Sequence, residues 1–483
     1  MTILLLLALL LLYWSWVARR RYGEPPIASG SLPLIGHGHK IFGNSIQLWE
    51  KFKALTHECI QKGHAVYFLI GTKKFYVLTD PDDINLVSNI CLQKDTMFAE
   101  LSKELVGEGL IFADVMTWKR HRKLILPTFN QKVIESFLPI FNIQGRNLVK
   151  ELEKKCGNGL FDSGSFFKQT ALQTVCATTM GVEVDRDKAL NFYRAYDLSI
   201  YRGIERFQKF WLQFDCIYNY TKMYKDKESC LKTVRALPEF VLSSKHKVFK
   251  LRNEKDVNND KKEKNIFLDQ LLSYSDELSE KEIFDEVRTM IVAGTDTSSN
   301  VLQFALILIG SYPNVQEKIF NELKNIFGDS NRDVEKNDLS ELTYLEAVLK
   351  ETMRYYVMAP FTARYIDKEI KLKNYTLQSG NNCFFSFYGV HRHEMWGKDA
   401  DQFRPERWFE NQLPSNPNAF IPFSIGKRNC IGRSFAMMFM KTILTHVLRR
   451  YTILADYTRL KIKLDVLIKP ASGHYISIEH KMK

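Results

Sequence analysis

The stretch that decides the fold is Phe423-Ser-Ile-Gly-Lys-Arg-Asn-Cys-Ile-Gly432, which places Cys430 between two glycines. Gly426 permits a tight turn that a side chain would obstruct, and Gly432 is expected to let the backbone pass closely where a helix begins. Cys430 then lies at a helix N-terminus, where free N–H groups and the helix dipole favour a thiolate and lower the thiol pKa. The sequence therefore predicts Cys430 as a metal ligand.

The other cysteines are interpreted differently. A lone cysteine in an apolar stretch is usually a small buried hydrophobe. We adopt that interpretation for the cysteines outside this loop, which show no C-x-x-C pair: Cys59, Cys91, Cys156, Cys176, Cys216, Cys230 and Cys383. Their spacing gives no disulfide framework and favours a reducing compartment.

The cysteine loop carries a family resemblance. Phe-x-x-Gly-x-Arg-x-Cys-x-Gly resembles, position for position, the heme-binding loop of the cytochromes P-450. The resemblance implies that Cys430 is the axial thiolate of heme iron, that Phe423 shields the sulfur and that Arg428 binds a heme propionate. A thiolate ligand pushes electron density onto the iron and favours O–O cleavage. The spelling is most similar to microsomal insect members of the fatty-acid-hydroxylase branch.

The same resemblance implies the fold and the cofactor. We expect a mainly α protein with a small β-rich region, in which a single triangular helical domain surrounds heme b and follows an N-terminal transmembrane helix. In some members of the branch a glutamate of the long helix bonds covalently to heme, but this chain has Ala293 there. Noncovalent heme is therefore expected.

A second motif lies upstream. Glu351 and Arg354 are three residues apart, so they share a helical face and can pair. The same E-x-x-R spelling at Glu183 and Arg186 is interpreted as a solvated pair worth about 0–1 kcal/mol. Glu351 differs because Arg407 follows it, and the family uses that arginine in a buried Glu-Arg-Arg triad. We expect a structural role for these three.

A third motif lies on a long predicted helix. Ala293-Gly-Thr-Asp-Thr297 resembles the oxygen-activation motif of the family. A threonine hydroxyl can bond the carbonyl four residues back and bend the helix, which opens a groove. The resemblance implies that Thr297 is the proton-relay hydroxyl and that Asp296 supplies protons. A polar, solvent-facing helical turn is the structural alternative.

Further basic residues suit the heme propionates and a partner. Trp118 and Arg122 match the W-x-x-x-R of the family and can both donate hydrogen bonds. Arg364 is another propionate candidate by resemblance. The neighbouring Lys119, Arg120 and Lys123 are expected on the surface, where they suit docking of an acidic flavoprotein reductase.

Local patterns predict the order of elements. Residues 66–79 indicate two strands turned at Gly71 and Thr72. A helix is predicted from the cap Ser279 to Gly310, and a buried last helix from about Arg433 to Arg450. No repeat or long linker divides the body. We therefore predict an anchor at residues 1–18, a hinge at 19–38 and a catalytic domain at 39–483.

The N-terminus predicts a membrane anchor. Residues 3–18 are uncharged and apolar, slightly short of the roughly 20 residues that span a bilayer. Basic residues follow this run instead of preceding it, which argues against a signal peptide and favours a cytosolic body on the endoplasmic reticulum membrane. The prolines and glycines of 19–38 indicate a stiff hinge. The sequons at Asn219 and Asn374 should then stay unmodified.

Charge excludes few partners by itself. The net charge of +13 lies largely in Arg19–Arg21 and in 245–264, without a basic helix interleaved with stacking aromatics, so no nucleic-acid partner is expected. The segment 245–264 is interpreted as a solvated connection between helices.

Three functions compete. The first is a monooxygenase that inserts oxygen from O₂ into a lipophilic molecule, with electrons from NADPH through NADPH-cytochrome P-450 reductase and, as a further partner, cytochrome b5. The second is a heme-thiolate isomerase or dehydratase, which the intact Asp296 and Thr297 disfavour. The third is a noncatalytic hydrophobic binder. Val357 and Met358 replace usual prolines and predict an altered cavity wall, and aromatics at 192–214 suggest an apolar roof or plain core.

Overall fold

Helices form most of the chain in the computed structural model, which describes residues 2–18, 21–95, 103–255, 266–410 and 413–481. The longer ones are α1 (Thr2–Ala18), α2 (Ser45–Gln61), α3 (Pro81–Ile90), α5 (Val115–Ile125), α7 (Leu138–Glu153), α8 (Gly164–Val175), α9 (Arg186–Gln208), α11 (Lys222–Lys255), α13 (Glu280–Ser311), α14 (Pro313–Phe327), α16 (Thr343–Tyr355) and α18 (Arg433–Arg450). Shorter ones are α6 (Gln131–Ser136), α10 (Asp215–Tyr218), α12 (Phe267–Leu272), α15 (Lys336–Glu341) and α17 (Phe387–Val390). The prediction of a mainly α fold is confirmed.

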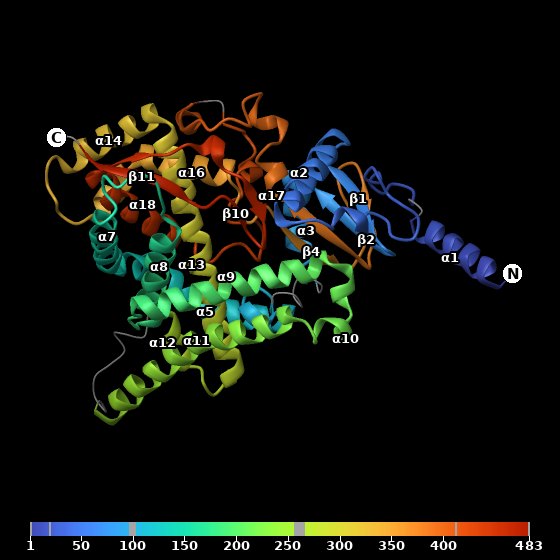
Figure 1. Cartoon of the computed structure of the whole chain (residues 1–483), viewed down its shortest axis with the longest axis horizontal. Coiled ribbons are helices and arrows are strands. Elements are labelled where there is room, and N and C mark those ends of the chain that lie inside the picture. Colours follow the sequence, from blue (N-terminus) through green and yellow to red (C-terminus); the bar gives the residue numbers. More distant parts are fainter. Residues whose placement is uncertain (1, 19–20, 96–102, 256–265, 411–412, 482–483) are drawn as a thin grey trace.

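Helix α13 forms where the long helix from Ser279 was predicted. The Ser279 side chain caps its first turn and Glu282 completes a capping box. With 32 residues at about 1.5 Å each it is on the order of 48 Å long. Figure 1 shows it running through the helical part of the molecule, and it packs against α8, α16 and α18. One helix can therefore carry residues from the surface to the interior.

Helix α18 spans the range predicted for the last helix and is buried on several faces. It packs against α7, where Phe141 meets Phe435 at a ring-centroid distance of 5.2 Å and Phe439 at 5.6 Å. This packing fixes the start of α18, which follows the cysteine loop directly.

The β-rich region lies at the other end of the molecule (Figure 1). Strands β1 (Ala65–Ile70), β2 (Lys73–Leu78), β7 (Asn381–Ser386) and β4 (Phe361–Ile366) form one sheet in that order. The predicted hairpin is confirmed: β1 and β2 are antiparallel, and Gly71 turns between them with φ +59°. Strand β7 joins β2 in parallel and β4 antiparallel.

The described residues also form strands of three further small sheets. They are β3 (Phe161–Asp162), β5 (Ile370–Lys371), β6 (Thr376–Leu377), β8 (Tyr451–Leu454), β9 (Ile462–Leu464), β10 (Ile468–Pro470) and β11 (Tyr475–His480). The hairpin of β9 and β10 returns the chain toward α13, which matters for the site below.

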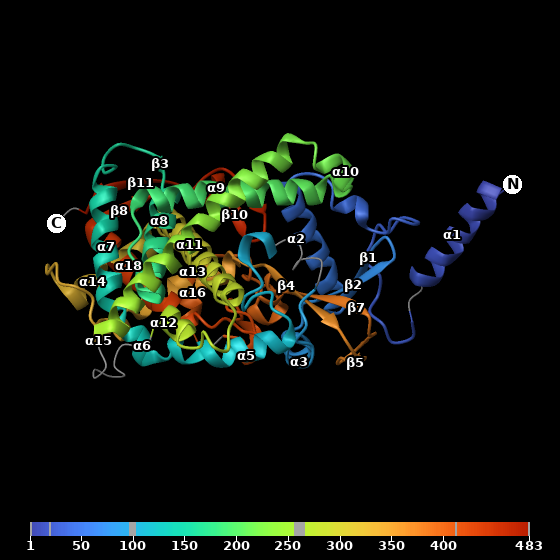
Figure 2. The same ribbon diagram turned by 90° about the horizontal axis from the view of Figure 1, so that it is seen from below.

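The N-terminal helix α1 forms where the anchor was predicted, and Figures 1 and 2 show it projecting beyond β1 and β2. Its 17 residues, at about 1.5 Å each, are shorter than the roughly 30 Å hydrocarbon core of a bilayer. Among the described residues, no helix has both the length and the apolar character needed to cross a membrane. The predicted transmembrane helix is thus not found in the structure.

Part of the predicted hinge is bound to the body. Glu24 is fully buried and pairs with Lys74, with Nζ 2.9 Å from the carboxylate. Ala28 donates its N–H to the Tyr67 carbonyl, and the Leu69 N–H donates to His37. Residues 24–38 therefore lie against β1. The division into anchor, hinge and catalytic domain stays a prediction.

The basic segment 245–264 was predicted as a connection, but its first part is helical. Helix α11 continues to Lys255, and Lys245 is buried in an ion pair with Asp269 at 2.8 Å. The helix thus continues into the segment that was predicted as a connection. Residues 256–265 lie outside the described residues.

Candidate active site

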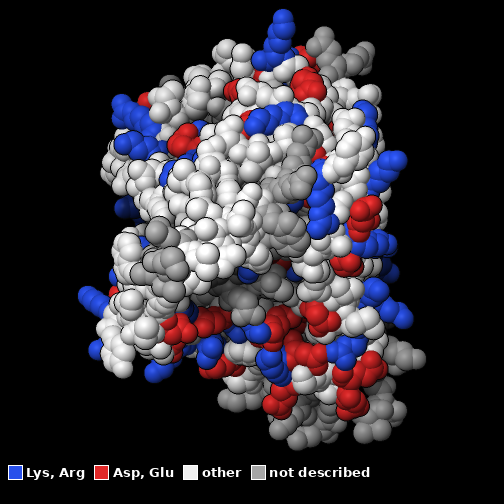
Figure 3. All heavy atoms as spheres, turned by 90° about the vertical axis from the view of Figure 1, so that its right-hand side faces the viewer, with Lys and Arg blue, Asp and Glu red and all other residues white. Residues whose placement is uncertain are grey.

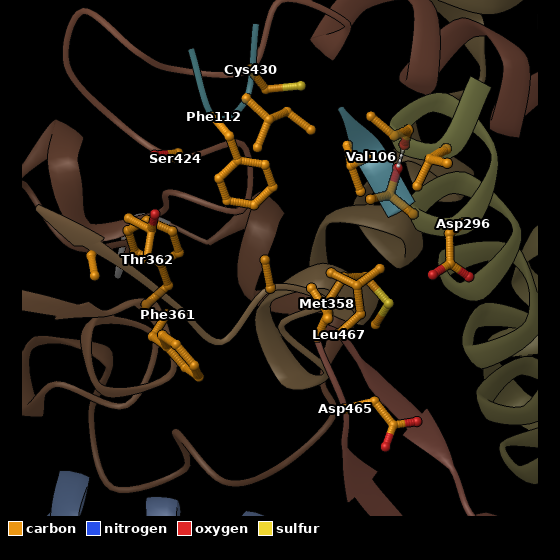
Figure 4. Close-up of a pocket in the computed structure, with 18 of the residues that line it drawn as sticks. Val106, Phe112, Asp296, Met358, Phe361, Thr362, Ser424, Cys430, Asp465 and Leu467 are labelled. Atoms are coloured by element: carbon orange, nitrogen blue, oxygen red, sulfur yellow. Dashed lines mark hydrogen bonds between the residues drawn. The ribbon is translucent and has the colours of Figure 1, made fainter. Parts of the chain in front are cut away.

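One large cavity of about 910 Å³ separates α13 from the cysteine loop. Figure 4 shows Cys430, Asp296, Met358 and Phe361 arranged around it; Met358 and Phe361 belong to one segment, whereas Asp296 and Cys430 come from two others. Met358 lines this cavity whereas Val357 is packed in the core, so only one of the two residues predicted to reshape the wall reaches it.

The aromatic stretch predicted as a cavity roof is divided. Tyr196 and Phe207 line the cavity. Phe192 packs in the core behind them, whereas Trp211 and Phe214 are exposed. Only the middle of the stretch therefore forms cavity wall.

The cysteine loop is folded tightly around its own backbone. Cys430 donates its N–H to the Phe423 carbonyl at 2.9 Å, and Asn429 donates to the Gly426 carbonyl at 3.1 Å. Gly426 has φ +76°, and a Cβ there would lie 2.3 Å from Ser88 Oγ. The need for glycine at this turn follows from both conformation and space.

The reason predicted for Gly432 is wrong. It caps α18 with φ −89°, which any residue can adopt, and the nearest atom to an added Cβ would be Cys430 Sγ at 4.0 Å. No backbone passes close by. A side chain at Gly432 would instead contact the sulfur.

The electrostatics of Cys430 also differ from the prediction. The exposed side of the Cys430 thiol borders the cavity, and protein surrounds its other sides. Burial raises the pKa of Cys430, while the Gly432 N–H and the charges of Arg122 and Arg433 lower it by less. Withdrawal of the thiolate from water thus outweighs the helix terminus. An anionic sulfur here requires the positive charge of a metal.

Three cations lie together beside this cavity: Lys94, Arg364 and Arg428. Lys94 and Arg428 line the cavity, and Arg364 is fully buried behind them. Burial lowers the pKa of Arg364 to about 10. Burial and the Arg364 charge lower the pKa of Arg428 to about 9, and burial and both guanidinium charges lower that of Lys94.

The Asp114 charge acts on Arg428, but the cationic cluster forms no close ion pair among the described residues. None of the three pairs with a described carboxylate, and Nε of Arg364 and both Nε and Nη1 of Arg428 are buried without a partner. Uncompensated buried charges are strongly destabilising. The donors suit the two carboxylates of a porphyrin, so the residues present fit heme. Sequence reasoning missed Lys94, which stands outside every motif.

The predicted W-x-x-x-R pair is partly engaged elsewhere. Trp118 is buried, and the Arg428 guanidinium lies 4.7 Å from its ring centroid. Arg122 donates to the Asn429 carbonyl and to Asn429 Oδ1, both at 2.7 Å. Arg122 therefore holds the cysteine loop with the donors that we expected to face a propionate. Phe423 lines the cavity beside the loop.

The structure brings Glu351, Arg354 and Arg407 together. Glu351 and Arg354 are fully buried, with Arg354 Nε and Nη2 donating to the carboxylate at 2.9 and 2.8 Å. Arg407 Nε donates to Glu351 Oε1 at 2.9 Å, and Trp408 Nε1 donates to Oε2 at 3.1 Å. Both oxygens of the Glu351 carboxylate therefore accept hydrogen bonds.

The second E-x-x-R does not form the pair that was predicted. Glu183 and Arg186 are both exposed, and Arg186 pairs with Glu151 instead. The two residues lie at opposite sides of the N-cap of α9, Asp185, so they do not share a helical face.

On α13, Thr297 donates its hydroxyl to the Ala293 carbonyl at 2.7 Å, as its spacing predicts. Asp296 lines the cavity (Figure 4) but is paired, with Lys469 Nζ at 3.0 Å. Asn300 donates to Asp296 Oδ1 at 3.0 Å. A solvent-facing turn is excluded, because Asp296 is 3% exposed.

Lys469 extends this pair toward the surface. It also contacts Asp197 Oδ1 at 3.2 Å, and Asp197, whose side chain is 40% exposed, pairs with Lys168. Burial lowers the pKa of Lys469, but Asp296 and Asp197 outweigh burial and raise it. Burial raises the pKa of Asp197, but Lys469 and Lys168 lower it to about 2. An ionic chain thus joins the cavity to solvent, and no sequence motif signalled Lys469.

A buried histidine links α5 to α13. His121 Nδ1 donates to Glu286 Oε1 at 2.7 Å, and its Nε2 lies 3.3 Å from Glu282 Oε1. His121 is 1% exposed and Glu286 fully buried. Burial lowers the pKa of His121, but the hydrogen bonds from Glu286 and Glu282 outweigh burial and raise it.

This pair predicts a pH-dependent stability. Because the pKa is raised in the folded state, the pair stabilises fully below the unfolded histidine value of about 6.5, and this stability is lost as the pH rises through the raised value. We expect H121Q to lower the urea midpoint most at low pH, with the difference from the native chain shrinking as pH rises. H57Q, at an exposed histidine of α2, should leave the profile unchanged. A difference that grows with pH would contradict the pair.

A cysteine loop that faces the same cavity as the Thr297 motif of α13, beside cations with no close ion pair among the described residues, is the arrangement of a heme-thiolate protein. The profile of the family Cytochrome P450 matches residues 31–477. Cytochrome P450 4V2 of Mus musculus is 30% identical over 475 residues, which cover 94% of this chain and 90% of that protein. Cytochrome P450 4c21 of Blattella germanica is 28% identical, covering 99% of this chain and 98% of that protein.

The chain belongs to the cytochrome P450 family, and it is a monooxygenase of that family. Cytochrome P450 4g15 of Drosophila melanogaster, 26% identical over 559 residues, is a second insect relative. The predicted similarity to insect members is confirmed.

Proposed function

We propose that this protein inserts one atom of O₂ into a lipophilic small molecule, with electrons from NADPH through a separate reductase. The observation that carries the proposal is the position of the Cys430 loop, which faces the same cavity as Asp296 and Thr297. When bound, heme with a thiolate ligand supplies the activation of oxygen. The remaining chemistry belongs to side chains of this chain.

The first task is to hold heme b. Cys430 would supply the thiolate ligand, and Phe423 would shield its sulfur. Arg364, Arg428 and Trp118 bind the propionates, and the buried, unpartnered nitrogens of the two arginines support this role. Lys94 is a further candidate. Gly426 keeps the loop tight, while Arg122 fixes it through Asn429.

The second task is to move protons while water is excluded. Thr297 and Asp296 are the proposed relay, and the Thr297 hydroxyl already spans one turn of α13 to Ala293. Lys469 holds the Asp296 carboxylate at the cavity edge. Asp197 at the outer end is partly exposed, so the ionic chain reaches from the cavity edge to solvent.

The third task is to bind an apolar substrate. Phe112, Phe361, Met358 and Leu467 line the cavity (Figure 4), and Ile204 of α9 contributes from another segment. Such walls bind by excluding water and need few polar groups. A fatty acid, a hormone-like lipid or a xenobiotic is the proposed substrate class.

Heme should be noncovalent, because Ala293 lines the cavity where a carboxylate would be needed. Acid and organic solvent should release all heme from the native protein. A293E should retain a heme fraction on the polypeptide after turnover, whereas A293Q, of equal size but without a carboxylate, should release it. Retention of heme by the native chain would contradict this prediction.

Two alternatives are separable in one assay. An isomerase or dehydratase needs neither O₂ nor electrons, and a binder shows no turnover. Purified protein with reductase should consume NADPH in proportion to hydroxylated product when a lipid and xenobiotic panel is tested. Product formed without NADPH would favour the isomerase, and ligand-induced spectral change without product would favour the binder.

We also propose attachment to the endoplasmic reticulum membrane with the body in the cytosol. The leucines of α1 from Leu5 to Leu12 are exposed, as are Trp211 and Phe214 near α10. Figure 3 shows a broad area without charged side chains on the face from which α1 projects. Removal of residues 2–18 should shift the protein from alkali-washed microsomes toward the supernatant. Glycans at Asn219 or Asn374, both exposed, would contradict the cytosolic orientation.

The proposed partners are NADPH-cytochrome P-450 reductase and cytochrome b5. Lys119, Arg120 and Lys123 are exposed on α5, as predicted, and Arg120 also pairs with Glu282. Exposed lysines can steer an acidic partner, and the effect weakens as salt rises.

A further inference from the structure

We propose that His64, His393 and Glu394 form a binding site for a divalent transition-metal ion, with Zn²⁺ as the best match. His64 lies between α2 and β1, whereas His393 and Glu394 follow α17. One ligand atom from each lies within 4.8 Å of the others, and this is the one such group of three among the described residues. None of the three lines the large cavity, so the site is separate from that of heme.

The separations between the ligand atoms are close to those found around one metal ion. His64 Nε2 lies 3.1 Å from Glu394 Oε1, and His393 Nδ1 lies 3.5 Å from Glu394 Oε2. The two imidazoles stack with centroids 4.2 Å apart and planes 17° apart. Ligand atoms about 2.0–2.1 Å from a tetrahedral zinc ion are roughly 3.3 Å from one another. The three ligand atoms are therefore close enough for one ion, but the rings are nearly parallel, so one imidazole must turn before both nitrogens point at that ion. Three protein ligands leave a fourth position open.

The His64 ring is fixed in the way that a metal-binding histidine usually is. Its Nδ1 lies 3.1 Å from Thr79 Oγ1, and Thr79 also donates its N–H to the His64 carbonyl at 3.0 Å. Thr79 is fully buried. A histidine that binds metal through one nitrogen usually gives its other N–H to a fixed acceptor, which sets the tautomer. Thr79 is placed to be that acceptor.

His393 supplies an independent observation. It is 7% exposed, and its Nε2 is buried without a hydrogen-bond partner in the described structure. Its Nδ1, which lies 3.5 Å from Glu394 Oε2, accepts a bond of 3.3 Å from the Met395 N–H, and a metal ion on Nδ1 would replace that bond. Buried polar atoms almost always have partners.

The test uses the heme-loaded full chain in a C216S background, which removes an exposed cysteine outside the cavity. Titration with Zn²⁺ in a calorimeter should show one strong site. H64Q and H393Q should each weaken that site on the order of 10-fold or more, as ligand loss does, and E394Q should weaken it as well. H57Q, at the exposed histidine of α2, should bind like the background protein.

Two further measurements guard against misfolded variants. Zn²⁺ should raise the thermal midpoint of the background protein and of H57Q but not of H64Q or H393Q. X-ray absorption of the zinc complex should show nitrogen and oxygen ligands at about 2.0–2.1 Å with imidazole scattering. The carbon monoxide spectrum reports an intact fold in each variant. Equal zinc binding by H64Q, H393Q and H57Q, or several weak sites that none of them alters, would overturn the proposal.

Discussion

Replacement of Glu351 by alanine should lower the free energy of unfolding by about 3–5 kcal/mol. The carboxylate accepts from Arg354 at 2.8 and 2.9 Å and from Arg407 at 2.9 Å, and all three side chains are at most 5% exposed. Without Glu351, Arg354 remains buried with no described carboxylate partner, and Arg407 keeps only the Asp399 carboxylate, whose Oδ2 lies 3.3 Å from its Nη2. Arg354 keeps its bonds to the carbonyls of Ala400 and Gln402, but these neutral groups do not offset its charge.

Urea unfolding followed by tryptophan fluorescence measures this effect, and the yield of heme-loaded protein reports it indirectly. E183A is the matched control, since it changes the same residue in the same E-x-x-R spelling. Glu183 is exposed and forms no pair with Arg186, so E183A should stay within about 0.5 kcal/mol of the native chain. Equal effects of E351A and E183A would show that the buried triad does not stabilise the fold.

R407K tests the geometry of the same triad. Arg407 donates from Nε to Glu351 and from Nη2 to the Asp399 carbonyl at 3.1 Å. A lysine keeps the charge but has a single nitrogen, so it cannot reach both partners in the same way. We expect R407K to lie between the native chain and E351A in stability.

The elements that could be predicted from sequence are set by neighbours along the chain. The capping box of Ser279 fixes the start of α13, and Gly71 fixes the turn between β1 and β2. The position of Cys430 just before α18 could be predicted because it also depends on neighbouring residues in the chain. Each of these signals acts over a few residues, so an isolated sequence reveals it.

The features that could not be predicted depend on long-range contacts. Lys94 reaches the cationic cluster because a backbone bridge pairs it with Arg364, far along the chain. Lys469 meets Asp296 only because the β9 and β10 hairpin folds back toward α13. The raised pKa of Cys430 has the same origin, since burial by distant segments outweighs the local helix terminus. Neighbouring residues show that a helix N-terminus lowers the thiol pKa, but they do not show how much burial raises it.

C430S should abolish the red-shifted Soret absorption of the reduced, carbon-monoxide-treated protein and reduce NADPH-dependent product formation to background. Serine nearly preserves the shape of the side chain, so the loop bonds from Cys430 N to Phe423 and from Asn429 to Gly426 should persist. Its hydroxyl is far less acidic than a thiol and does not become an anionic ligand under these conditions. The absorption and the activity should therefore be lost because serine does not provide the thiolate ligand, and not because the protein unfolds.

C216S provides the control, because Cys216 is an exposed cysteine on α10 that does not line the cavity. It should keep both the absorption and the activity. Near-native thermal midpoints for C430S without heme, compared with the native chain without heme, would separate loss of the ligand from unfolding. Because burial raises the pKa of the Cys430 thiol, the ionised sulfur depends on the iron it binds. If C430S kept the thiolate absorption, another cysteine would have to be the ligand, and the assignment of this cavity as the site of oxygen activation would fall with it.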